Sequence, residues 1–112
     1  FGAPTAAFWI ARRYATPFLM VVLNNRGWAS PKLSMRGVYP TGMGSLASGE
    51  KLSVGFGEED NADFGGIAAA AGGAWARKVE RAEEVKSVFE EAIKVVLLER
   101  RCAVVECVIE SI

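Results

Sequence analysis

The feature of this chain with the clearest chemical potential is an apolar run that ends in two adjacent amides and a nearby glycine. The run covers residues 18–23, and Asn24, Asn25 and Gly27 follow it. Side-chain amide oxygens are suitable ligands for a hard divalent cation. Gly27 adds a backbone carbonyl that a ligand can approach closely, because no side chain obstructs it. These residues are therefore candidate cation ligands.

The apolar run before them predicts a buried strand. Six consecutive apolar residues, 18–23, are typical of a strand covered on both faces, as the strands of a parallel sheet are. In open α/β sheets, ligands bind outside the carboxyl ends of the strands, where the connecting loops form a crevice. The simpler alternative is a turn without a ligand, since asparagine tolerates left-handed backbone geometry.

The rest of the chain predicts alternating helices and strands. Helices are expected over residues 6–14, 64–71 and 83–98, and strands over 18–23, 75–79 and 103–109. The helix at 83–98 has the strongest pattern, because its apolar residues recur at intervals of three and four. Residues 61–63 can cap the helix at 64–71, and a glycine pair ends it. This order indicates an α/β fold with a parallel sheet and right-handed crossovers.

A long segment between the first strand and the second helix lacks clear periodicity. It is rich in glycine and serine, and we expect an active-site loop at about residues 29–60. Its glycine-rich part lacks the Gly-Lys-Ser/Thr ending of a phosphate-binding loop. Glu58, Glu59 and Asp60 form a charge run whose default reading is a solvated surface. The expected role is a mobile loop over the crevice.

Composition excludes several classes of function. The 112 residues suit one small domain. The 13 basic and 13 acidic residues balance, so the net charge does not indicate binding to nucleic acid or to an anionic membrane. Cys102 and Cys107 would point to opposite faces of one strand, so free thiols of an intracellular protein are expected. With no membrane-length apolar segment or visible targeting signal, the expected compartment is the cytoplasm or an organelle. Because the chain starts with Phe1, we interpret it as a fragment of a longer protein.

Three segments together resemble a known cofactor-binding domain. They are Asn-Asn-Arg-Gly-Trp at 24–28, the segment 61–73 that opens with Asn-Ala-Asp-Phe and ends in a glycine pair, and the closing Val-Val-Glu-Cys-Val at 104–108. The pattern resembles the C-terminal domain of thiamine-diphosphate-dependent enzymes of the acetolactate synthase, benzoylformate decarboxylase and 2-hydroxyacyl-CoA lyase kind, and it spans nearly the whole chain. The resemblance implies part of a doubly wound parallel sheet with helices on both faces.

The resemblance assigns roles to four residues. Asn25 would give its side-chain oxygen, and Gly27 its backbone carbonyl, to a magnesium ion that fastens the cofactor diphosphate. Asn24 would stabilise the turn after the strand beside the cofactor. Trp28 stands where the family commonly has tyrosine and would line the cofactor site. Thiamine diphosphate and Mg²⁺ are thus the implied cofactors, and a 2-oxo acid or related acyl donor is the implied substrate.

Parts of the family site have no counterpart in this sequence. The Gly-Asp-Gly half of the metal motif is absent, and by spacing it would lie a few residues before Phe1. The glutamate that activates the cofactor ring would come from a partner subunit, which implies a homodimer or homotetramer of the full-length protein. The chain contains no histidine. No catalytic residue is therefore assigned, and the fragment alone is not expected to be active.

The leading hypothesis is the cofactor-binding portion of a lyase, decarboxylase or carboligase, the last being a transferase. A non-catalytic α/β remnant or interaction domain that has lost the cofactor site is the alternative. A flavodoxin-like nucleotide binder would share the sheet but would need a phosphate-binding loop after a first strand, which the sequence does not show.

Overall fold

A computed structural model describes residues 5–27, 29–42 and 62–110. The chain divides into two compact units, which are described separately. The larger unit comprises residues 1–24 and 63–109, and the smaller comprises residues 25–62 and 110–112.

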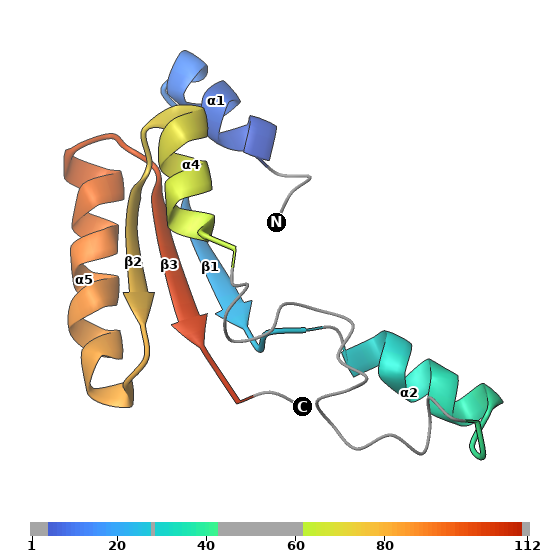
Figure 1. Ribbon diagram of the computed structural model, residues 1–112. Coiled ribbons are helices and arrows are strands. Elements are labelled where there is room, and N and C mark those ends of the chain that lie inside the picture. Colours follow the sequence, from blue (N-terminus) through green and yellow to red (C-terminus); the bar gives the residue numbers. More distant parts are fainter. Residues whose placement is uncertain (1–4, 28, 43–61, 111–112) are drawn as a thin grey trace. The chain divides into compact units, whose positions relative to one another are not determined.

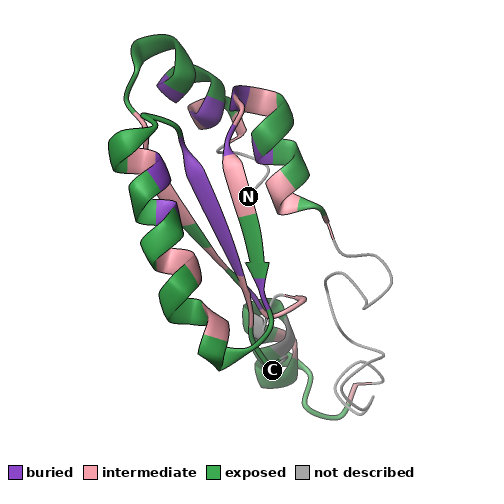
Figure 2. Ribbon diagram, turned by 90° about the vertical axis from the view of Figure 1, so that its left-hand side faces the viewer, coloured by how far each residue is buried: buried purple, intermediate pink, exposed green. Residues whose placement is uncertain are grey.

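The larger unit is built on a sheet of three parallel strands (Figure 1). The strands are β1 (Leu19–Asn24), β2 (Trp75–Val79) and β3 (Ala103–Val108), in the order β1-β3-β2. The central strand β3 is buried from Ala103 to Glu106 (Figure 2). The expected α/β fold with a parallel sheet is confirmed. Because the strands are parallel, their carboxyl ends all lie at the same end of the sheet.

Helices cover both faces of this sheet (Figure 1). Helices α1 (Thr5–Tyr14) and α4 (Phe64–Gly72) lie on one face, and α5 (Ala82–Leu98) lies on the other. Phe8 and Val104 are central to the core on the α1 and α4 side, whereas Ala92 and Val105 are central on the α5 side. Cys102 belongs to the first core and Cys107 borders the second, so the predicted opposite orientation is confirmed and both thiols are free.

The two ends of α4 are fixed by the residues that the sequence indicates. The Asp63 side chain accepts a hydrogen bond from the backbone N–H of Gly66 at 2.8 Å, which satisfies a free donor of the first turn. Gly73 adopts a left-handed φ of 69° and donates its backbone N–H to the carbonyl of Ala69. The helix therefore begins and ends at fixed points above the sheet.

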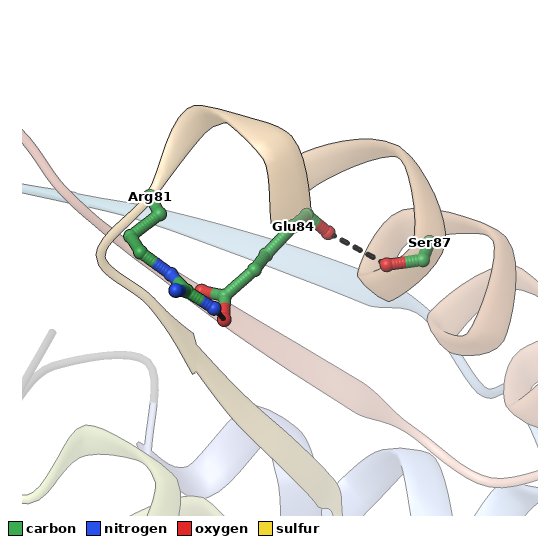
Figure 3. A network of polar contacts seen from close by, with 3 residues as sticks. All are labelled: Arg81, Glu84 and Ser87. Atoms are coloured by element: carbon green, nitrogen blue, oxygen red, sulfur yellow. Dashed lines mark hydrogen bonds and ion pairs between the residues drawn. The ribbon is translucent and has the colours of Figure 1, made fainter.

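Helix α5 begins with an exposed network of three residues (Figure 3). Arg81 donates from Nη2 to Oε1 of Glu84 at 2.6 Å, and the Ser87 hydroxyl donates to the backbone carbonyl of Glu84. The hydrogen bond from Arg81 holds the pKa of Glu84 below its ordinary value. This pairing therefore adds stability above the ordinary carboxyl pKa and loses it as the pH falls through the lowered one. Its contribution is small because both groups face water.

One correction concerns the segment expected to be a loop at about 29–60. Its first part forms α2 (Ala29–Val38), in the smaller unit. Pro31 lies in the first turn, where a missing N–H is tolerated, and leucine, methionine and arginine favour helix. Leu33 and Val38 of this helix are exposed. The remainder of the expected loop, from residue 43, lies outside the described residues.

A second correction concerns the faces of β1. The sequence predicts that other elements cover both faces of this strand. However, Val21 and Leu23 are 42% and 66% exposed within the described part of the chain. They lie on the α5 side, where α5 contacts mainly β2 and β3. Met20 and Val22 on the other side pack against the core under α1 and α4.

None of the described helices is long and apolar enough to span a membrane.

The close contact between α1 and α4 gives a first prediction. A Cβ added at Gly72 would lie 2.3 Å from the backbone oxygen of Phe8, so Gly72→Ala forces the two helices apart. We expect it to lower the free energy of unfolding by about 1–3 kcal/mol, as overpacking does. Gly37→Ala is the matched control, because nothing lies within 4 Å of its added Cβ and alanine favours helix. Urea denaturation checks both, and equal effects would contradict the packing argument.

Candidate functional site

The carboxyl ends of β1 and β3 carry a buried pair of polar side chains. Asn24 donates from Nδ2 to Oε1 of Glu106 at 2.7 Å, and the two residues are only 6% and 7% exposed. The register pairs Val22 with Glu106, so Asn24 lies one step further along the same sheet face. The backbone carbonyl of Asn24 also accepts from the N–H of Ile109 at 3.0 Å. The end of β1 is therefore held to β3 by both side chain and backbone.

Asn25 opens a tight turn in the smaller unit, and it immediately follows Asn24 in the chain. Its Oδ1 accepts a hydrogen bond from the backbone N–H of Gly27 at 3.3 Å. Arg26 between them has a φ of 62°, in the left-handed region that non-glycine residues rarely occupy. Such a conformation outside glycine costs roughly 1–3 kcal/mol, and strained residues of this kind cluster at functional sites.

This turn offers hard oxygen donors. The amide oxygen of Asn25 has two lone pairs, and within the described residues its hydrogen bond from Gly27 leaves one for a ligand. The Gly27 carbonyl is the second donor of the expected set. Amide and carbonyl oxygens suit Mg²⁺, which commonly takes few protein ligands and completes its octahedron with substrate phosphates and water. The donor chemistry of the turn therefore fits a magnesium–diphosphate group.

One predicted site residue, Trp28, lies outside the described residues. The acidic run of Glu58, Glu59 and Asp60, which the sequence predicts as solvated surface, also lies outside them. Within the described ranges, no three His, Cys, Asp or Glu side chains gather where they could hold a metal.

A pocket of about 210 Å³ lies beside Glu106, under the first turn of α4. It is lined by Asp63, Gly65, Gly66, Ala76, Arg77, Lys78, Val104 and Glu106. The N-terminus of a helix attracts anions. Here, however, the Asp63 carboxylate already bonds to that turn, and Glu106 adds a second carboxylate to the wall. Arg77 and Lys78 line the same pocket, so its wall carries charges of both signs, and its helix N-terminus is already capped by Asp63.

A larger pocket, of about 370 Å³, lies at the opposite, amino-terminal ends of the strands. Two of its three arginines donate to carbonyls that follow helix ends. Arg101 donates from Nε to the carbonyl of Gly73 at 2.6 Å, and Arg100 donates from Nη2 to that of Ala15 at 3.3 Å. Cations are favourable at helix C-termini, and an added anion there is not. These arginines therefore join the helix ends to the sheet.

Glu106 is the site residue that the sequence prediction missed. A single acidic residue within an otherwise apolar strand is the signal that could have found it, because glutamate is almost never buried without a partner. The identity of the partner depends on the register between β1 and β3. That register brings Asn24 and Glu106 together across 82 positions of sequence.

Cys107, next to Glu106 in β3, gives a pH-dependent prediction. Burial raises the pKa of its thiol, and the Glu106 charge raises it further. The folded protein therefore holds this proton more tightly, and its stability falls as the pH rises above the thiol pKa of the unfolded chain. At pH 8.5, we expect iodoacetamide to modify Cys107 more slowly in the folded protein than in the urea-unfolded protein. Glu106→Gln should lower the pH at which modification of the folded thiol reaches half its maximal rate. Rapid modification of the folded thiol below pH 7 would contradict this.

The three parallel strands with helices on both faces define an α/β domain of the class that binds ligands outside the carboxyl ends of its strands.

Comparison with known families identifies this domain more closely. The family model described as thiamine pyrophosphate enzyme, C-terminal TPP binding domain, matches residues 1–107. The chain therefore belongs to this family, whose C-terminal domain binds thiamine diphosphate. Searches of curated proteins and of solved structures gave no significant match.

Proposed function

We propose that the turn at residues 25–27 anchors the diphosphate of thiamine diphosphate through a magnesium ion. Asn25 contributes its Oδ1 and Gly27 its backbone carbonyl. The observation that carries this proposal is the bend at Arg26, with its φ of 62°, which leaves the Asn25 Oδ1 3.3 Å from the Gly27 backbone nitrogen. Family membership supports it, because the domain is a cofactor-binding one.

The chain's own residues bind and orient rather than react. Asn25 and Gly27 would hold a metal that fastens the diphosphate, and a Gly-Asp-Gly motif outside this chain would supply an acidic ligand. Asn24 stabilises the turn, and Trp28 lines the cofactor site. When bound, thiamine diphosphate supplies the nucleophile and the electron sink for breaking bonds next to a carbonyl. Proton transfer falls to groups outside this chain, which contains no histidine.

The reaction class follows from the same proposal. The protein that carries this chain acts as a lyase, decarboxylase or carboligase on 2-oxo acids or related acyl donors, in the manner of acetolactate synthase. It works as a homodimer or homotetramer, because the glutamate that activates the cofactor comes from a partner subunit. We expect this chain by itself to be inactive.

Calorimetric titration of thiamine diphosphate into the protein that carries this chain tests the proposal. We expect binding with Mg²⁺ present and at least a tenfold weaker affinity when EDTA removes it. Binding that is equal in both conditions would contradict the magnesium anchor. No binding in either condition would instead favour a domain that has lost its cofactor site.

A further inference from the structure

The buried contact between Asn24 and Glu106 has no part in the proposed metal ligation. Both side chains are more than nine-tenths buried, and the 2.7 Å separation of Nδ2 and Oε1 is that of a strong, charge-assisted hydrogen bond. A buried glutamate needs such a partner, since an unpaired carboxylate in the core is costly. Hydrophobic residues of similar size could fill the same space, so the polar pair is not needed for packing alone.

The position of this pair points to a role at the ligand turn. Asn24 is the last residue of β1, and the next residue, Asn25, begins the turn. The carbonyl of Asn24 is fixed by Ile109 and its side chain by Glu106, both from the strand β3 or its extension. The backbone therefore leaves the sheet at Asn24, a residue that is fixed through both its carbonyl and its side chain. Shifts of about 1 Å at such points strongly weaken sites that need exact ligand placement.

We propose that Glu106 is a positioning residue, which holds the Asn24 amide and thereby sets where the turn at residues 25–27 begins. This inference rests on the proposed function, because the turn matters as a metal anchor only if the cofactor binds there. Outer partners of metal ligands typically change metal affinity by 10–100-fold when removed. Glu106 acts one step further back, through Asn24, and we expect about a tenfold effect.

The test measures the Mg²⁺ affinity of the intact protein in the presence of thiamine diphosphate. Glu106→Ala leaves the buried Asn24 amide without this acceptor, and the affinity should fall about tenfold. Glu106→Gln keeps an acceptor oxygen at the same reach, and its affinity should stay within threefold of wild type. Equal losses in the two variants would overturn the proposal.

A reversal of the pair makes the test specific. Asn24→Asp places two carboxylates against each other, and the Mg²⁺ affinity should fall at least tenfold. Adding Glu106→Gln supplies an amide donor to the new aspartate, so the double variant should recover to within threefold of wild type. A double variant no better than Asn24→Asp alone would overturn the proposal, because neighbours in one hydrogen bond must show coupling.

A control separates positioning from stability. Val105→Ala truncates a fully buried residue of the same strand on the opposite face. It should lower the urea midpoint at least as much as Glu106→Ala while leaving the Mg²⁺ affinity within twofold of wild type. If Val105→Ala weakens Mg²⁺ binding as much as Glu106→Ala does, Glu106 acts through stability and the proposal fails.

A readout without cofactor completes the design. In the cofactor-free protein, the side-chain amide protons of Asn24 should exchange slowly with solvent by NMR, and Glu106→Ala should make them exchange at least tenfold faster. Unchanged exchange would overturn the contact itself. If wild type shows this protection but binds no thiamine diphosphate, the proposed function fails and the positioning role fails with it. If wild type binds and the reversed pair shows no recovery, only the role of Glu106 fails.

Discussion

Replacing Asn25 with alanine abolishes Mg²⁺-dependent binding of thiamine diphosphate, which is the largest effect that we expect from any single substitution. The change removes the side-chain oxygen that we propose as a ligand of Mg²⁺, a metal that requires near-ideal octahedral coordination. Loss of even an outer partner of a metal ligand costs about 10–100-fold, so loss of a direct ligand should cost at least as much. Calorimetry with Mg²⁺ in excess measures the change.

Two further substitutions separate metal ligation from turn formation at this residue. The Asn25 Oδ1 also accepts the Gly27 N–H, so alanine removes two interactions together. Asn25→Ser keeps a turn-forming oxygen on a shorter side chain, and it should bind as poorly as alanine. Asn25→Asp keeps an oxygen at the same reach, and its affinity should stay within about tenfold of wild type. Normal binding by the serine variant would show that the turn alone matters.

Replacing Phe8 with alanine lowers the free energy of unfolding by about 3–5 kcal/mol, as large-to-small core changes of this kind do. Phe8 is fully buried, and its ring centroid lies 5.1 Å from that of Phe18. Its backbone also contacts Gly72 of α4, so the residue joins α1, α4 and the start of β1. The shift of the urea midpoint, with an unchanged slope, measures the loss.

The neighbouring Trp9 provides the control for this prediction. It is the larger aromatic residue, but it is 56% exposed and its described ring contact is with the guanidinium of Arg13 at 5.9 Å. Trp9→Ala should therefore cost less than about 1 kcal/mol. A loss as large as that of Phe8→Ala would mean that the core is centred elsewhere.

The sequence predicted those elements whose pattern follows directly from burial. The helix expected at 83–98 appears as α5, and the strand expected at 75–79 is β2 within its predicted bounds. Local signals were equally informative, since Asp63 and Gly73 fix the ends of α4 through short-range hydrogen bonds. Helix α2 was missed because its sequence mixes a proline, two serines and a glycine, which favour other conformations, with few apolar residues.

The site was predictable only in its local part. Asn25 and Gly27 lie two residues apart, so their spacing and types already indicate a turn with oxygen donors. The pairing of Asn24 with Glu106 depends on strands far apart in the chain, whose register emerges only when the sheet forms. The exposed side of β1 was also beyond sequence patterns, because a run of apolar residues does not say which helix reaches which strand.

The most direct test of the magnesium anchor is a crystal structure of the protein with thiamine diphosphate and Mn²⁺, which anomalous scattering locates in place of Mg²⁺. We predict that the metal lies at a bonding distance of about 2.1 Å from both the Asn25 Oδ1 and the Gly27 carbonyl oxygen. A metal bound to the diphosphate with neither of these oxygens in its coordination sphere would contradict the assignment.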